Sequence, residues 1–220
     1  MKLFRTEKSP NGRCHVYFSN IKIASYKSKK IEKSNVFVQG LNNTITNSHK
    51  NKRCRCYVYG NNNKIILGDN LDWSGDIYIG LPEVPVDNCS VVIGDNSFSN
   101  GTNIRICEDN TTVEIGKDCL FSSGITIWAS DTHTVTDIDG NITNIGKYVK
   151  IGNHVWVGMF AAILKNTTIP DNCIVGTHCV VGGTYKKTNC VIAGNPGKIV
   201  KENINWDKRQ PKQYIIDTKK

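Results

Sequence analysis

A six-residue repeat dominates this chain. Every sixth residue from 145 to 181 is Ile or Val. A period of six matches neither the 3.6-residue period of a helix nor the two-residue period of a long strand. It predicts a chain that runs straight briefly, turns and runs again, with one apolar side chain pointing inward from each flat face, so that three faces close a triangular coil of about 18 residues. The repeated positions are Ile145, Ile151, Val157, Ile163, Ile169, Val175 and Val181, and a second register runs through Ile115, Phe121 and Ile127.

Residues that favour sharp turns recur between the apolar positions. Gly, Asn and Asp accept the left-handed backbone angles that a corner demands, and Gly-Asp-Asn stands at both 68–70 and 94–96. Small side chains such as Cys119 and Cys173 follow four positions after an inward residue, where they fit a tight corner. The pattern therefore predicts stacked coils joined by tight turns.

The extent of the repeat divides the chain into three parts. Residues 35–189 are expected to form roughly eight stacked coils. Residues 1–34 are expected to form a strand-like N-terminal cap, and residues 190–220 a C-terminal capping segment with a mobile basic tail. A short helix over residues 197–206 is expected to close the open end of the prism.

One segment interrupts the register. Continuing by sixes from Ile127 places His133 and Asp139 at inward positions, where a narrow prism has no room for an unpaired carboxylate. Residues 131–144 are therefore predicted to leave the coil as a loop. Loops on a rigid scaffold carry function disproportionately, so the loop is the first candidate for a functional site.

The net charge limits the kinds of partner that this chain is expected to bind. The net charge of +9, from 28 Lys and Arg against 19 Asp and Glu, describes either a solvated surface or a surface that meets an anionic partner. Nucleic acid is not expected, because no recognition pattern accompanies the charge.

The nine cysteines form no CxxC pair and no zinc-ligand spacing, so free thiols in a reducing compartment are expected. No apolar stretch is long enough to span a membrane or resembles a leader, which predicts a cytoplasmic location.

Three sequence blocks carry a family resemblance. They read IGKDCLFSSGITIWASDTHTVTD, then IGNHVWVGMFAAILKNTTIPDNCIVGTHCVVGG, then CVIAGNPGKIVKENINW. Over roughly residues 90–206 the chain resembles the hexapeptide-repeat acetyltransferases, and among them the bacterial capsule and polysialic acid O-acetyltransferases. The resemblance implies a left-handed parallel β-helix, which is an exception to the usual handedness of parallel crossovers. It also implies a homotrimer with active sites between subunits, and transfer of acetyl from acetyl-CoA to a hydroxyl of a sugar or polysaccharide without a metal.

The resemblance assigns roles by motif. His133 corresponds to the general base that removes the proton of the acceptor hydroxyl. The main-chain amide of Met159 corresponds to the donor that stabilises the oxyanion. Trp156 either lines the site or anchors the surface where subunits meet. The remaining positions are Thr177, Gly182 and Gly183 along the pantetheine arm, Lys198 and Lys201 at the phosphates, and Asn100 or Asn103 at the acceptor.

The chain departs from the family pattern at one turn. Family members commonly carry Pro-Gly after the Ile-Leu pair, whereas here Lys165-Asn166 follow Ile163-Leu164. The change is expected to alter a turn and the charge of the groove without removing a catalytic group.

Other functions stay open. The γ-class carbonic anhydrases share the fold, but two of their three histidines lie within about one hexad. Here His133, His154 and His178 are 21 and 24 residues apart, so a metal is not expected. A purely structural solenoid would have no use for the loop. N-acetylation of an amino sugar and O-acetylation of serine are alternatives, and the positive charge favours an anionic acceptor such as a sialic acid polymer.

Overall fold

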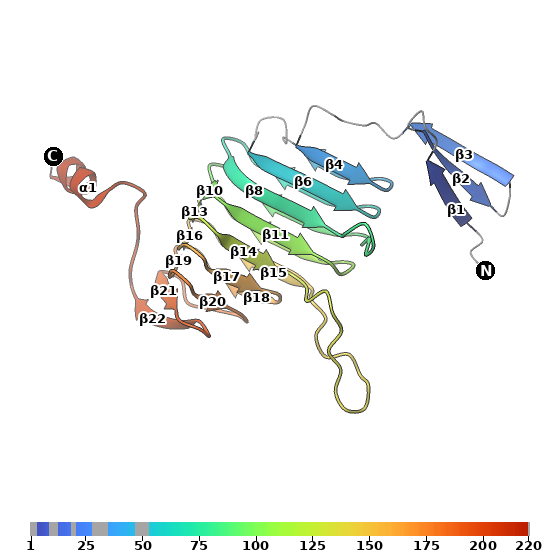
Figure 1. The fold of residues 1–220 in the computed structure, drawn as a ribbon. Coiled ribbons are helices and arrows are strands. Elements are labelled where there is room, and N and C mark those ends of the chain that lie inside the picture. The colour runs from blue at the N-terminus through green and yellow to red at the C-terminus, as the bar shows by residue number, and fades with distance from the viewer. Residues whose placement is uncertain (1–3, 9–12, 19–20, 28–34, 47–52, 220) are drawn as a thin grey trace.

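Three flat faces of parallel β-strands make up most of the molecule (Figure 1). The structure is a computed structural model that describes residues 4–8, 13–18, 21–27, 35–46 and 53–219. Each strand pairs in parallel with the strands on the same face of the preceding and following coils. The described coils form a left-handed parallel β-helix, as expected.

The strands of each face follow one another down the stack. The first face consists of β4 (Val36–Gln39), β6 (Cys54–Tyr59), β8 (Asp72–Ile79), β11 (Thr102–Ile106), β14 (Ile125–Trp128), β17 (Ala162–Leu164) and β20 (Val180–Val181). The second face consists of β5 (Thr44–Thr46), β7 (Lys64–Leu67), β9 (Ser90–Ile93), β12 (Thr112–Ile115), β15 (Tyr148–Ile151) and β18 (Thr167–Ile169). The third face consists of the start of β8 followed by β10 (Phe98–Asn100), β13 (Leu120–Phe121), β16 (Trp156–Val157), β19 (Ile174–Val175) and β21 (Cys190–Ala193).

The stack is shorter than the repeat suggested. Within the described residues, seven strands stack on the first face and six on the second, which makes about six turns instead of the roughly eight coils expected. Several coils are longer than 18 residues because they carry insertions, such as the turn closed by the Leu81–Val84 bridge.

The three edges of the prism differ in what they carry. We call the edge between the first and second faces the loop edge, because the chain leaves the prism there after β14. The edge between the second and third faces is the glycine edge. The edge between the third and first faces is the Met159 edge, after the residue that follows β16 closely in sequence.

Glycines stack on one another along the glycine edge. A Cβ on Gly116 would lie 2.6 Å from the carbonyl carbon of Gly152, and a Cβ on Gly94 would lie 2.6 Å from that of Gly116. No real side chain tolerates such an approach, so only glycine lets neighbouring coils pack here. The corners are completed by left-handed residues, such as Asn96 with φ of 58° and Asp118 with φ of 57°, as the turn pattern predicts.

Inward side chains fill the prism with apolar volume. Phe121 and Trp73 are the largest of them, and both are fully buried with ring centroids 5.0 Å apart. The repeat predicted the inward positions correctly, since Ile115, Phe121, Ile127, Ile151, Val157, Ile163, Ile169, Val175 and Val181 are all buried.

The assignment of Ile145 to this inward series is wrong. Its side chain is 55% exposed, because it lies at the end of the loop. The inward register resumes with Val149 in β15, which is fully buried.

The cysteines of the coils pack inside them. All eight cysteines from Cys54 to Cys190 are buried, and each of these is a free thiol, as expected. Cys119 and Cys173 occupy corners, as expected. Burial raises the pKa of the Cys89 and Cys119 thiols to about 11, so little of the nucleophilic thiolate form is present at neutral pH.

The N-terminal residues form strands of their own. β1 (Phe4–Lys8), β2 (Arg13–Phe18) and β3 (Ile21–Lys27) pair as an antiparallel sheet. That residues 1–34 cap the coils stays a prediction, and residues 28–34 lie outside the described part of the chain.

The helix expected over residues 197–206 is wrong. Residues Lys198–Glu202 form β22, which pairs antiparallel with β21. The last coil leaves backbone N–H and C=O groups open along β21, and an added strand satisfies them. The β-branched Ile199 and Val200 also favour a strand over a helix.

A helix does form further along the expected basic tail. α1 spans Pro211–Thr218, with Pro in its first turn. Arg209 pairs with Asp207 and Asp217, so this part of the tail has its own structure. None of the described helices is long and apolar enough to cross a membrane.

Candidate active site

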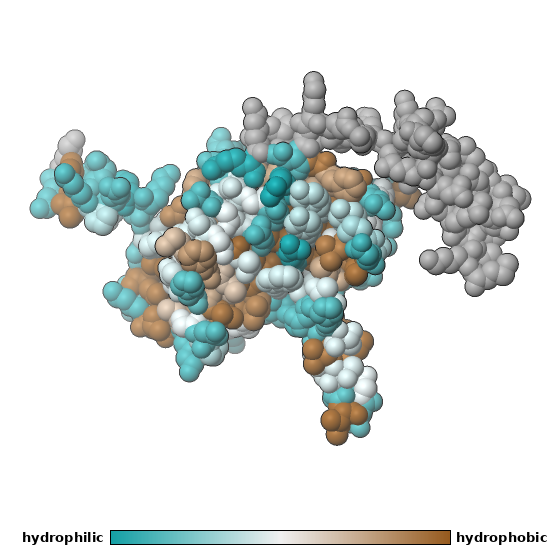
Figure 2. All heavy atoms as spheres, in the orientation of Figure 1, coloured by the Kyte–Doolittle hydropathy of each residue, from teal (hydrophilic) through white to brown (hydrophobic). Residues whose placement is uncertain are grey.

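The predicted loop leaves the prism between β14 and β15 (Figure 1). Residues 131–143 are all exposed, and Thr136 and Ile142 form the bridge that closes the loop on itself. Figure 2 shows that the loop stands clear of the coils and carries apolar side chains toward its tip. The interruption of the repeat therefore located a real excursion of the chain.

His133 lies near the start of this loop, with its backbone held on both sides. Its N–H donates to the carbonyl oxygen of Asp131 at 2.7 Å, and its own carbonyl accepts from the Asn144 amide at 2.8 Å. Thr132 adopts a left-handed conformation with φ of 68°, which is rare for a β-branched residue. Residues held in rarely populated backbone conformations cluster at functional sites, which adds to the reasons to examine this loop.

Met159 lies on the opposite edge of the first face. It is 47% exposed and follows β16 at the corner, where the next residue, Phe160, is left-handed with φ of 57°. The carbonyl of Met159 accepts from the N–H of His178 at 2.9 Å. Within the described residues no acceptor pairs with the Met159 N–H, so this amide is free to donate to another molecule.

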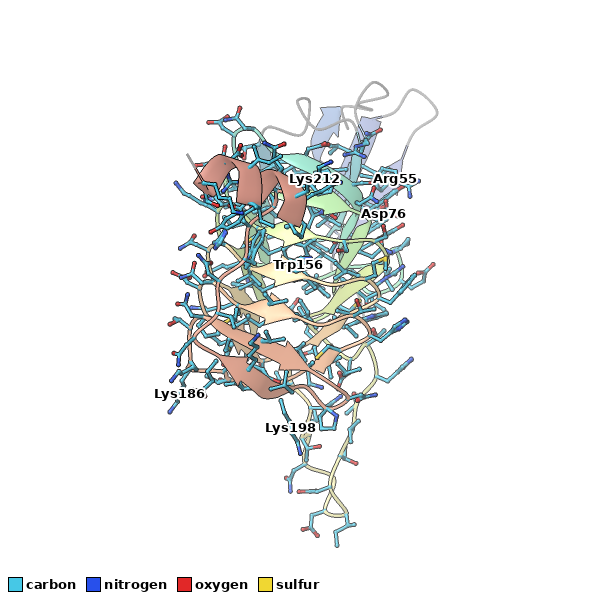
Figure 3. The ribbon with its side chains drawn as sticks, turned by 90° about the vertical axis from the view of Figure 1, so that its left-hand side faces the viewer. Arg55, Asp76, Trp156, Lys186, Lys198 and Lys212 are labelled. Atoms are coloured by element: carbon cyan, nitrogen blue, oxygen red, sulfur yellow. The ribbon has the colours of Figure 1, made fainter. Side chains whose placement is uncertain are left out.

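Trp156 lies in β16 on the third face (Figure 3), and its aromatic neighbour is Trp206. Trp156 is 37% exposed, and its ring centroid lies 6.1 Å from that of Trp206. Trp206 stacks on His154 at 4.2 Å and donates from Nε1 to the His154 carbonyl at 2.8 Å. His154 is therefore a corner residue with a structural contact. Sequence reasoning missed Trp206 as a neighbour of the site, although it ends the third family-like block.

The expected cofactor residues fall on two edges of the prism. Thr177 lies directly beneath Gly158 on the Met159 edge, where a Cβ on that glycine would lie 2.7 Å from the Thr177 nitrogen. Gly182 and Gly183 follow β20 on the loop edge. Lys198 and Lys201 belong to β22 at the C-terminal end of the stack, and both are exposed.

The two acceptor candidates also differ in position. Asn100 lies on the Met159 edge, where its side-chain amide donates to Ser123 Oγ at 2.9 Å. Asn103 lies on the first face in β11, and its Oδ1 accepts from the Asp76 N–H at 3.3 Å. Only Asn100 shares an edge with Met159.

A single chain does not bring His133 and Met159 together. His133 leaves from the loop edge and Met159 lies on the Met159 edge, with the whole first face between them. Buried core residues such as Ile127 and Ile163 fill the space behind that face. The residues expected to act on one acetyl group thus lie on opposite sides of one prism.

No metal centre accompanies these residues in the part of the chain that the structure describes. No three His, Cys, Asp or Glu side chains gather there in a way that could hold an ion. His154 stacks on Trp206, and His178 stacks on Phe160 at 5.0 Å.

Comparisons with known proteins point to one group. The family model described as bacterial transferase hexapeptide (six repeats) matches residues 143–183. The chain is 37% identical over 199 residues to a polysialic acid O-acetyltransferase of Neisseria meningitidis, covering 81% of this chain and 92% of the relative. It is 33% identical to a polysialic acid O-acetyltransferase of Escherichia coli O1:K1 / APEC, covering 62% of this chain and 44% of that longer relative.

Two solved structures extend the similarity to the fold. The structure of the polysialic acid O-acetyltransferase OatWY has a TM-score of 0.59 and 33% identity, covering 83% of this chain and 95% of that one. The structure of the polySia specific acetyltransferase NeuO has a TM-score of 0.61 and 25% identity, covering 83% of this chain and 92% of that one.

Proposed function

Because the chain belongs to the bacterial hexapeptide-repeat O-acetyltransferases, we propose that it transfers acetyl from acetyl-CoA to a hydroxyl of a capsule polysaccharide that contains sialic acid. The observation that carries this proposal is the match to the Neisseria meningitidis polysialic acid O-acetyltransferase along 92% of that protein. The net charge of +9 supports an anionic acceptor.

The proposed chemistry uses one side chain and one main-chain amide. His133 takes the proton of the acceptor hydroxyl as the hydroxyl oxygen bonds to the thioester carbon. The Met159 N–H donates to the carbonyl oxygen, where negative charge develops. The imidazolium of His133 then returns the proton to the sulfur as the carbon–sulfur bond breaks. The acyl group never bonds to the enzyme, so the buried cysteines have no part in transfer.

The other proposed roles follow from the family motifs. Thr177, Gly182 and Gly183 would line the pantetheine arm, and the exposed Lys198 and Lys201 would meet the phosphates as point charges. Asn100 is favoured over Asn103 at the acceptor, because it shares an edge with Met159. The buried free thiols support a reducing, cytoplasmic location.

A panel of acceptors tests the proposed reaction. Purified protein with labelled acetyl-CoA is expected to label a sialic acid polymer far more than a neutral capsule polysaccharide, glucosamine or serine. Transfer is measured as acid-stable label on the isolated acceptor, and mild base should release it because an ester is formed. Labelling of glucosamine or serine alone would overturn the polysaccharide acceptor.

We further propose that the working enzyme is a homotrimer with each site shared between two copies. His133 and Met159 lie on different edges of one chain, so the loop of one copy must approach the Met159 edge of the next. The loop has apolar side chains for such a contact, since Val135, Ile142 and Ile145 are each more than half exposed.

Mixing two inactive variants tests the shared site. His133→Ala removes the base and Met159→Pro removes the amide donor, and Pro is common in a turn just before a left-handed residue such as Phe160. Each variant alone is expected to be inactive. Trimers formed randomly from equal amounts should recover about a quarter of the parent activity, because each intact site draws one group from each variant. No recovery in co-purified mixed trimers would place both groups in one copy.

A further inference from the structure

We propose that Glu108 and Lys165 are positioning residues that grip the base of the loop from the coils on either side and so hold His133 in place for transfer. The inference rests on the proposed role of His133. Neither residue was predicted to belong to the site. The hydrogen bonds that carry the proposal run to Asp131 and Gly146, and not to the His133 side chain.

Glu108 holds the loop from the preceding coil. Its Oε1 accepts from the N–H of Asp131, where the loop begins, at 3.3 Å. Its Oε2 accepts from the N–H of Gly146, where the loop ends, at 2.6 Å. One half-buried carboxylate therefore bridges both ends of the excursion. Hydrogen bonds to a charged acceptor are stronger than neutral ones, so this bridge is a firm one.

Lys165 holds the loop from the following coil. Its Nζ forms an ion pair and hydrogen bond with Asp131 Oδ2. The Lys165 side chain is only 20% exposed, so water screens the pair less than it would on an open surface. The hydrogen bond from Lys165 keeps the pKa of Asp131 below its usual range, so this carboxylate stays charged at neutral pH.

The neighbouring Asn166 forms two further hydrogen bonds, at the end of the loop. Its Oδ1 accepts from the Lys147 N–H at 2.9 Å, and its Nδ2 donates to the Ile145 carbonyl at 3.1 Å. Lys165-Asn166 stand where family members commonly carry Pro-Gly. The departure was expected to alter a turn and a charge; the structure shows that it ties down both ends of the loop.

Asn144 links Asp131 to the backbone of His133 by hydrogen bonds. Its Nδ2 donates both to Asp131 Oδ2 at 2.8 Å and to the His133 carbonyl at 2.8 Å. Its Oδ1 accepts from the Val135 N–H at 2.9 Å. Asp131 thus links Lys165 to Asn144, and Asn144 holds the backbone of His133. Loss of the Lys165 end would free Asp131 next to Thr132, whose left-handed conformation depends on its surroundings.

Two variants and two controls test this proposal. Lys165→Met removes the charge but keeps the length, and Lys165→Arg restores the charge. Glu108→Gln replaces one of two acceptors by a donor that faces a backbone N–H. Lys117→Met is the matched control, because it breaks an ion pair with Asp95 at 3.1 Å on the glycine edge, away from the loop.

Steady-state kinetics and amide exchange supply separate readouts. Lys165→Met and Glu108→Gln are expected to lower kcat about ten- to hundredfold with KM for acetyl-CoA within about twofold, because small misplacement of a reacting group is costly. Hydrogen–deuterium exchange of residues 131–146 should be faster in both variants. Lys165→Arg should recover kcat to within about threefold, and Lys117→Met should match the parent in every measurement.

Three outcomes would overturn the positioning role. The first is parental kcat in both variants, and the second is a loss of kcat without faster exchange in the loop. The third is a rise in KM for acetyl-CoA at unchanged kcat, which would make Lys165 a cofactor-binding residue. If the parent protein transfers acetyl to no acceptor, the proposed function fails, while the exchange comparison still decides whether Glu108 and Lys165 hold the loop.

Discussion

Replacing His133 with Ala is expected to lower kcat by about 10²- to 10⁴-fold, the usual contribution of a general base. The acceptor hydroxyl would then have to lose its proton to water as it attacks. The side chain is exposed on the loop and fills no core position, so binding of CoA and assembly should not change. Kinetics with a sialic acid polymer, calorimetry with CoA and light scattering measure the three properties.

The neighbouring Thr134→Ala supplies the control for this variant. Thr134 lies in the same loop and is also exposed, so its loss tests whether any change in the loop lowers activity. Parental activity is expected. If His133→Ala keeps activity within about tenfold of the parent, another group must serve as the base.

Replacing Phe121 with Ala is expected to have the largest effect on stability, lowering the free energy of unfolding by about 3–5 kcal/mol. Phe121 is fully buried against Trp73, and neighbouring coils cannot close the resulting space without breaking their hydrogen-bonded register. Urea unfolding at fixed protein concentration measures the change, since assembly makes stability depend on concentration.

Phe37→Ala is the matched control for the core variant. Phe37 is 44% exposed on the first face and contacts Tyr59 at 5.3 Å between ring centroids. Its loss is expected to cost about 1 kcal/mol or less, because surface substitutions seldom cost more. Equal losses from the two variants would show that Phe121 is not packed more tightly than a surface ring.

Sequence periodicity predicted the coils and the loop because both depend on local spacing. The inside of the prism is narrow and apolar, so the apolar residues that recur every six positions, such as Val157 and Ile163, are ones that point inward. The same rule located the loop, since His133 and Asp139 could not occupy inward positions.

Contacts between distant residues were beyond the reach of such a pattern. Glu108 is 23 residues from Asp131 and 38 from Gly146, while Lys165 is 34 residues from Asp131. The inserted loop sets these separations, so a six-residue repeat cannot predict which of these residues are in contact. β22 was missed for a related reason. β22 pairs with the open edge of β21, and that edge exists only once the coils have stacked.

The stacked glycines of the glycine edge have a consequence for how this chain could change in evolution. From the last residue of one strand to the first residue of the next, the chain always advances by five positions across that edge: from Ile115 to Leu120, from Ile151 to Trp156 and from Ile169 to Ile174. The backbone contact leaves no room for an additional residue. The bridge at Leu81 and Val84 and the loop of residues 131–144 both emerge on the loop edge instead. Insertions and deletions among descendants of this chain should therefore accumulate on the loop edge, where they do not disturb the stack.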